Sequence, residues 1–243
     1  MSDERQIDAV AFLGRRRARI LELLGEAARR SGRRADDVTL VAVSKTVGPE
    51  QVAAAWRAGY RRFGENRPQE LSRKLAALAA HPELSPLRFD MVGNLQTNKI
   101  NQVLGRVALI HSVSSLHLAT SIAKRAARRG IVSEVLLEVN VSGEASKGGF
   151  SVQELRRDID QLAGLEGIAV RGLMTMAPAH DAAAARRTFA GLRELAEELR
   201  QISGLPLEQL SAGMSDDFQA AVEEGSTIVR LGRVVFDPGY TIA

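Results

Sequence analysis

Apolar residues recur along the chain in two rhythms, helical at the start and strand-like afterwards. Over residues 3–30, five apolar residues stand at helical spacings, and Ser31-Gly32 follows as a stop signal. They are Ile7, Val10, Leu13, Leu21 and Leu24. This pattern predicts one amphipathic N-terminal helix over about residues 3–30.

From residue 38 onward, short β-rich runs alternate with helical patterns. The runs lie at 38–43, 61–64, 88–92, 107–111, 134–141, 168–174, 207–211 and 227–231. Helices are expected at 49–59, 65–80, 114–130, 151–163, 182–202 and 215–224, with a shorter one at 97–104. No linker rich in Pro, Gly or Ser separates these segments. Such alternation predicts parallel strands joined by right-handed crossovers.

Eight strand–helix units are typical of a (β/α)8 TIM barrel, whose usual length is about 250 residues. The alternative is a doubly wound open sheet, which usually has fewer strands and a glycine-rich turn after the first. Here the first strand ends in "SKTVGPE", which is not such a turn. The sequence therefore predicts an α/β fold, a single barrel over about residues 38–235 with an extra N-terminal helix. We expect one domain over residues 1–243.

In such barrels the chemistry lies at the carboxyl ends of the strands. Polar or special residues stand at nearly every predicted end: Lys45, Asn66, Gly93-Asn94, His111-Ser112, Asn140, Met174-Thr175, Ser211 and Arg230. The set holds one lysine and one arginine, with no carboxylate pair and no metal-like set of His and Asp. It predicts a site for an anionic carbonyl compound rather than a hydrolase or metal site. We expect His111 to be a hydrogen-bonded structural histidine, and an acid or base is the alternative.

Lys45 follows four apolar residues, Leu40 to Val43, at the predicted end of the first strand. A lysine at a barrel mouth can form a Schiff base with an aldehyde when its amine is neutral part of the time. Burial and a neighbouring cation such as Arg230 promote the neutral form. The alternative is that Lys45 only reaches from the strand end into water.

The stretch "LSAGMSDDFQAAVEEGSTIVRLGR", residues 210–233, predicts a phosphate-binding corner. Ser211 ends the seventh strand, and Ser215 stands where a helix is expected to start, a place whose N–H groups favour phosphate. Gly232 follows the eighth strand and allows a close approach of the backbone to a ligand. Barrels often bind phosphate after strands seven and eight. A serine N-cap and a turn glycine without a ligand are the alternative. Together with Lys45, this corner points to an aldehyde that bears a phosphate.

Arg230 adds a hint about the rest of the ligand. Pyridoxal phosphate enzymes place either an acid or an arginine at the pyridine nitrogen. An arginine donates hydrogen bonds there but keeps its proton, so the ring nitrogen stays largely unprotonated and the cofactor is a weaker electron sink. The alternative is that Arg230 pairs with a carboxylate such as Glu223 or Glu224.

Seven stretches, in order from residue 40 to 232, jointly resemble the pyridoxal phosphate homeostasis protein family, whose members are similar to the N-terminal barrel domain of alanine racemase. They are "LVAVSKT", "RFGENRPQE", "FDMVGNLQTNK", "HSVSS", "LLEVNVSGEASKGGF", "GLMTMAP" and "LSAGMSDDFQAAVEEGSTIVRLG". The resemblance implies that pyridoxal 5'-phosphate is the cofactor and is held as a Schiff base on Lys45. It also implies phosphate contacts from the loop Ser211–Ser215, which includes Met214, and from Gly232. Ring contacts near Asn66 and Arg230 at the pyridine nitrogen complete the implied site.

Members of this family are regarded as vitamin B6 handling proteins without an established catalytic turnover. The implied function is to bind pyridoxal phosphate and to buffer it or deliver it to apo-enzymes. The alternative is a pyridoxal phosphate-dependent amino acid racemase. Two-base racemisation needs a second acid/base, a tyrosine in alanine racemase, opposite the lysine. The two tyrosines, Tyr60 and Tyr240, stand at no predicted strand end, so we favour a carrier without catalysis.

One stretch departs from the family pattern. After Phe236 the family usually continues with Gly-x-Arg, whereas this chain has Asp237-Pro238-Gly239-Tyr240.

The composition of the chain argues against nucleic-acid-binding, membrane and secreted proteins. Arginine clusters are scattered and the chain has only one Trp, two Tyr and seven Phe, so the net charge of +4 does not favour nucleic-acid binding. No stretch approaches the roughly 18 apolar residues of a membrane span, and the N-terminus lacks a signal-peptide pattern. We therefore expect a cytoplasmic protein with no membrane or nucleic-acid partner. The family resemblance implies a monomer.

Overall fold

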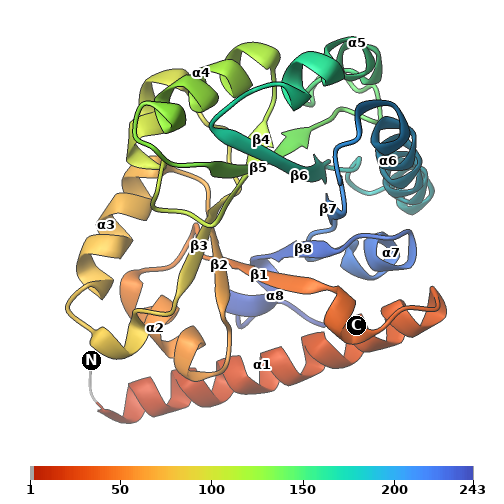
Figure 1. Cartoon of the computed structure of the whole chain (residues 1–243). Helices are drawn as coiled ribbons and strands as arrows, with labels where there is room; N and C mark the ends of the chain where they lie inside the picture. Colours follow the sequence, from red (N-terminus) through yellow and green to blue (C-terminus); the bar gives the residue numbers. More distant parts are fainter. Residues whose placement is uncertain (1–2, 243) are drawn as a thin grey trace.

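A computed structural model describes residues 3–242 of the chain. Eight parallel strands close into a barrel in chain order, and β8 pairs back onto β1 (Figure 1). The strands are β1 (Thr39–Val43), β2 (Arg62–Glu65), β3 (Arg88–Met91), β4 (Leu109–Val113), β5 (Ser133–Glu138), β6 (Ile168–Met174), β7 (Gln209–Ser211) and β8 (Ile228–Leu231). The predicted (β/α)8 barrel is confirmed.

Helices alternate with these strands and surround them (Figure 1). They are α1 (Asp3–Arg30), α2 (Pro49–Arg57), α3 (Pro68–Leu78), α4 (Leu116–Ala127), α5 (Val152–Ala163), α6 (Ala182–Ser203), α7 (Phe218–Glu223) and α8 (Arg233–Phe236). Three short 3-10 helices are η1 (Ala35–Asp37), η2 (Pro82–Leu84) and η3 (Thr97–Gln102). Within the described residues, no helix combines the length and apolarity needed to cross a membrane.

Several predicted boundaries were wrong for local reasons. The helix expected from residue 65 begins at Pro68, because Glu65 is the last residue of β2 and proline suits a first helical turn. The segment expected to be helical over 97–104 is the 3-10 helix η3, which ends at Gln102 after two turns, as is usual for this tighter helix type. The helix expected from residue 215 begins at Phe218. The short helix α8 was not predicted.

The strand alternation divides the core into an inner and an outer layer. Six side chains fill the barrel interior, namely Val41, Val43, Leu109, Leu136, Met174 and Ile228. Residues of the opposite parity, such as Ala42, Val229 and Leu231, pack outward against the helices. Because β1 pairs with β8 in the register Val41 to Arg230, a polar residue of β8 enters the same interior.

The N-terminal helix α1 lies along one flank of the barrel, against α2, α7 and α8 (Figure 1). Its buried stripe includes Leu13, Ile20 and Leu24, whereas Ile7 and Leu21 of the predicted stripe are exposed. The helix is long enough to cover three neighbouring helices of the barrel.

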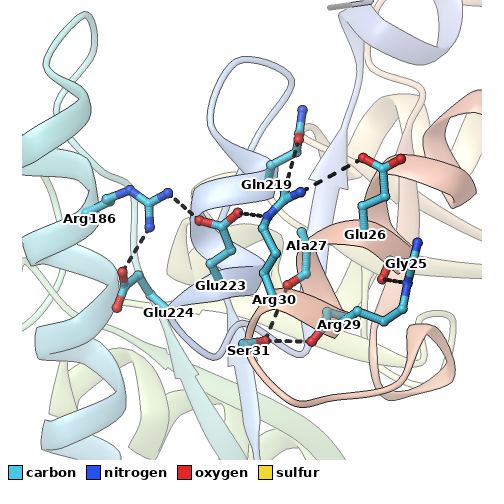
Figure 2. A network of polar contacts seen from close by, with 11 residues as sticks. Gly25, Glu26, Ala27, Arg29, Arg30, Ser31, Arg186, Gln219, Glu223 and Glu224 are labelled. Carbon is cyan, nitrogen blue, oxygen red and sulfur yellow. Dashed lines mark hydrogen bonds and ion pairs between the residues drawn. The ribbon is translucent and has the colours of Figure 1, made fainter.

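Ion pairs hold the end of α1 in place (Figure 2). Arg30 donates to the Glu223 carboxylate of α7 at 2.5 Å, and Arg186 of α6 contacts the same carboxylate. Arg186 also donates to Glu224 at 3.1 Å. These two glutamates are therefore partners of Arg30 and Arg186, and the alternative pairing of Arg230 with them is wrong.

Candidate functional site

Lys45 lies two residues after the end of β1, at the carboxyl end of the barrel, and its side chain is exposed. Its strand stands between β8 and β2. Asn66 follows β2 and is half-buried, with its N–H 3.3 Å from the Glu65 carboxylate. The sequence placed both residues at strand ends, and the structure brings them to neighbouring positions on one barrel edge.

A buried ion pair contacts Ser44, the residue that precedes Lys45. The Lys74 ammonium, from α3, contacts the Glu65 carboxylate and donates to the Ser44 carbonyl at 2.6 Å. The Ser44 hydroxyl donates to the same carboxylate at 2.7 Å. Because Lys74 is only 1 % exposed, its amine is closed to any ligand at the mouth. Of these two lysines, only Lys45 is open to a ligand.

Arg230 points into the barrel from β8 and is buried. One N–H group donates to Ser211 Oγ at 2.6 Å, and another donates to the Thr175 carbonyl at 2.9 Å. Burial lowers the pKa of Arg230 to about 10, and the charges of Asp217 and Glu138 oppose that shift. The guanidinium is therefore a cation at neutral pH. It also has five N–H donors, so further donors remain for a ligand.

A chain of polar contacts continues from Ser211 across the barrel interior. His111 Nδ1 lies 2.8 Å from Ser211 Oγ, and His111 Nε2 lies 3.1 Å from Asp90 Oδ2. Arg62 donates to the same Asp90 oxygen at 2.7 Å. These partners fit a neutral imidazole that donates from Nε2 and accepts from the serine hydroxyl. Burial lowers the pKa of His111, although the hydrogen bond with Asp90 opposes this.

The sequence had placed His111 at the end of the fourth strand, and this was wrong. The apolar run "VALI" gives no sign of where pairing starts, and β4 extends from Leu109 to Val113. His111 is therefore in the middle of β4 and is fully buried. Its expected role as a hydrogen-bonded structural histidine agrees with its contacts to Ser211 and Asp90.

The turn after β7 depends on Gly213, whose importance the sequence reading missed. Its φ of 92° lies in the left-handed region, and a Cβ there would lie 2.7 Å from Ala221 Cβ and 2.9 Å from Phe218 Cα. Only glycine fits. Met214 follows and is 41 % exposed, and its N–H donates to the Asp217 carboxylate at 2.6 Å. The chain thus folds back in a tight turn.

This turn leaves hydrogen-bond donors free beside β8. Ser215 Oγ accepts from the Val234 N–H at 3.2 Å, so its own O–H proton is available. Among residues 3–242, none accepts from the backbone N–H of Ser215 or Gly232. Gly232 is the N-cap of α8, and a Cβ there would lie 3.4 Å from the Val43 carbonyl of β1. Backbone donors of this kind suit an anion.

Other predicted strand-end residues serve the scaffold. Ser112 donates to the Gly93 carbonyl at 2.5 Å and ties β4 to the end of β3. Asn140 organises its own loop, because its side chain donates to the Glu144 carbonyl at 2.8 Å and accepts from the Gly143 N–H at 3.0 Å. Asn94 is exposed. Seven predicted residues lie on the neighbouring strands β7, β8, β1 and β2 or shortly after them, namely Lys45, Asn66, Ser211, Met214, Ser215, Arg230 and Gly232.

Two further groups at this end were missed by the sequence reading. Glu138 ends β5 and is buried, and burial raises the pKa of its carboxyl while the charge of Arg230 opposes this. Tyr240 donates to the Ser215 carbonyl at 2.8 Å, although it lies 25 residues away in sequence. Neither residue had a local signal, since a strand-end glutamate and a tail tyrosine are common in any protein.

Comparison with known proteins places this geometry in a family. Residues 22–237 match the family model for the alanine racemase N-terminal domain. The pyridoxal phosphate homeostasis protein of Aquifex aeolicus is 41 % identical over 222 residues, which cover 91 % of this chain and 96 % of the relative. The chain belongs to the pyridoxal phosphate homeostasis protein family.

Two solved structures share the fold of this chain and more than a third of its sequence. A protein from Bifidobacterium adolescentis is similar with a TM-score of 0.88 and 37 % identity, over 97 % of both chains. PipY of Synechococcus elongatus, solved with pyridoxal phosphate bound, is similar with a TM-score of 0.77 and 37 % identity. That match covers 82 % of this chain and 92 % of PipY.

Proposed function

We propose that this protein binds pyridoxal 5'-phosphate on Lys45 and serves vitamin B6 homeostasis by buffering the cofactor or delivering it to apo-enzymes. The observation that carries the proposal is the grouping of three kinds of donor at one barrel edge. An exposed amine, a buried guanidinium and free backbone N–H groups lie on β1, β8 and the turn between β7 and α7. PipY, at 37 % identity, supports this because its structure holds pyridoxal phosphate.

The donor set matches the chemical groups of the cofactor. When bound, pyridoxal phosphate supplies an aldehyde that reacts reversibly with primary amines. Lys45 offers the amine, and the N–H groups of Ser215 and Gly232, with the Ser215 hydroxyl, offer donors to the phosphate. Ser211 holds Arg230 in place, so that the guanidinium can donate to the pyridine nitrogen. The residues present therefore fit the cofactor.

Two remaining contacts belong to the same proposal. Asn66 stands beside Lys45 on the neighbouring strand and is positioned to contact the ring. Met214 lies exposed within the phosphate turn and contributes backbone to it. We further infer that the barrel and α1 form one pyridoxal phosphate-binding unit, and that the protein acts as a cytoplasmic monomer.

A racemase is the other candidate, and the tyrosines argue against it. Racemisation needs an acid/base on the face of the substrate opposite the lysine. Tyr60 lies between α2 and β2 and is buried. The Tyr240 hydroxyl is hydrogen-bonded to the Ser215 carbonyl and to Asp216, and burial together with Asp216 raises its pKa to about 12. Neither hydroxyl is placed to exchange protons with a substrate near neutral pH.

Two measurements separate carrier from enzyme. Holo-protein is mixed with an apo-enzyme that requires pyridoxal phosphate, and we expect the enzyme to regain activity. The same holo-protein is incubated with L-alanine or L-serine in heavy water, and we expect negligible deuterium at Cα. Rapid Cα exchange that is lost in Lys45→Ala would contradict the carrier function and support a racemase-like enzyme. Failure to bind pyridoxal phosphate at all would contradict the proposal as a whole.

A further inference from the structure

The C-terminal segment lies against the turn proposed to hold the phosphate. The Tyr240 hydroxyl shares its single proton between the Ser215 carbonyl, at 2.8 Å, and Asp216 Oδ1, at 2.9 Å. Both acceptors belong to the turn that follows Gly213. This contact involves the stretch 237–240, where the chain departs from the family pattern of Gly-x-Arg.

Two arginines hold Tyr240 in position. Arg16, from α1, donates to the carbonyls of Asp237, Pro238 and Tyr240 at 3.1, 3.3 and 2.6 Å. The guanidinium of Arg233 lies 5.6 Å from the centroid of the Tyr240 ring and forms an ion pair with Asp216. The segment is thus fixed to α1 on one side and to the start of α8 on the other.

These contacts occupy the acceptor groups of Ser215 and leave its donor groups free. The Ser215 carbonyl is occupied by Tyr240 and the Ser215 Oγ lone pair by the Val234 N–H. What remains on Ser215 are an N–H and an O–H, both suited to phosphate oxygens. Because a free turn samples many conformations, a hydrogen bond that fixes its carbonyl also fixes the direction of these donors.

The contacts of Tyr240 and Arg233 also fix the position of a negative charge, the Asp216 carboxylate, beside the proposed phosphate turn. Asp216 carries a carboxylate one residue from Ser215, and a carboxylate close to a phosphate dianion repels it. Arg233 and Tyr240 both bind this carboxylate and hold it against the C-terminal segment. The raised pKa of Tyr240, about 12, keeps its hydroxyl protonated and able to donate throughout the physiological range.

From this geometry we propose that Tyr240 is a positioning residue that makes the site select the phosphorylated aldehyde over its phosphate-free form. The proposal rests on the proposed function, because it concerns the same phosphate turn. It assigns a role to α1 as well, since Arg16 of that helix secures the segment from which Tyr240 extends.

The test compares two ligands that differ only in the phosphate. Apo-protein is titrated with pyridoxal 5'-phosphate and with pyridoxal, using the wild type and Tyr240→Phe. Loss of one hydrogen bond predicts an affinity for pyridoxal phosphate about three- to tenfold lower in Tyr240→Phe. The affinity for pyridoxal should remain the same. Tyr60→Phe removes the other tyrosine hydroxyl, which has no partner among the described residues, and serves as the matched control with unchanged binding of both ligands.

A measurement without cofactor completes the test. Amide hydrogen exchange of apo-protein should be faster in Tyr240→Phe in the peptide that contains Ser215 and Asp216, and unchanged in the barrel strands. Equal losses of affinity for both ligands, or no loss for either, would overturn the role of Tyr240. A wild type that binds neither ligand would instead contradict the proposed function, so the two failures are distinguishable.

Discussion

Arg230 is buried in the barrel interior and still keeps its charge. Its pKa, lowered by burial to about 10, still leaves it protonated at neutral pH, and Ser211 and Thr175 fix its orientation. An arginine of this kind donates to a pyridine nitrogen without protonating it, because it does not release its proton. At the pyridine nitrogen, where we propose that it lies, Arg230 would leave the bound cofactor a weak electron sink, which suits storage better than carbanion chemistry.

Replacing Arg230 with Gln should lower the affinity for pyridoxal phosphate by about tenfold to hundredfold, the equivalent of losing a hydrogen bond from a charged donor. The absorption spectrum of the bound cofactor should shift as well. Both are measured by spectrophotometric titration. Arg171→Gln is the control, because Arg171 is exposed on β6 and pairs with Glu134. Unchanged affinity and spectrum in Arg230→Gln would assign Arg230 to the scaffold alone.

We expect His111 to make the free energy of unfolding depend on pH. Its pKa is lowered by burial, with Asp90 opposing and the charges of Arg230 and Arg62 adding to the shift. The unfolded chain titrates near the ordinary value of about 6.5, so below that pH it binds more protons than the folded chain. The free energy of unfolding should therefore fall as the pH decreases from 7 to 5.

Substituting His111 by Gln should reduce this pH dependence by up to about 1.4 kcal/mol per pH unit. Urea titrations at pH 5, 6 and 7 measure the slope. His117→Gln, on the exposed face of α4, should leave the slope unchanged. Identical slopes in wild type and His111→Gln would mean that His111 titrates normally in the folded protein.

The helix α3 fixes the ends of two strands through one side chain. Lys74 reaches from α3 to the Glu65 carboxylate at the end of β2 and to the Ser44 carbonyl just after β1. Lys45 and Asn66 are the next residues on these two strands. A buried ion pair stabilises a fold little by itself, but it is costly to break because the remaining charge is left without a partner.

Lys74→Met should therefore lower the free energy of unfolding by about 3–5 kcal/mol, and Lys74→Met combined with Glu65→Leu should recover much of the loss. Urea titrations of the three proteins measure this. Lys124→Met, on the exposed face of α4, is the control for a surface lysine. A double variant as unstable as the single one would show that packing, and not the uncompensated carboxylate, determines the cost.

The presence of the strands and the long helices could be predicted from the sequence, but several of the residues at which they begin or end could not. Short β-rich runs between helical patterns were enough to identify eight strands and the long helices. They could not fix the register of His111 in β4, since the run "VALI" is uniformly apolar. They also missed the turn at Ser215, because the demand on Gly213 comes from Ala221 and Phe218 packing against it.

At the scale of the whole molecule, closure of the barrel explains why much of the candidate site could be predicted from the sequence. Once eight strands close, β8 must lie beside β1, and Arg230 and Lys45 come to one edge. Contacts between side chains distant in sequence have no such rule. The pairs Lys74–Glu65, Tyr240–Ser215 and Arg16–Tyr240 depend on how helices and tail dock, and no local pattern encodes that docking.

The proposed function requires that Lys45 holds pyridoxal phosphate covalently. The most direct measurement is borohydride reduction of the cofactor-loaded protein, followed by peptide mapping of the pyridoxyl group. We predict that the group is recovered on Lys45, because this lysine is exposed at the barrel edge beside the proposed phosphate turn, whereas Lys74 is buried in its pair with Glu65. Recovery chiefly on Lys74, Lys99, Lys124 or Lys147 would contradict covalent binding at Lys45.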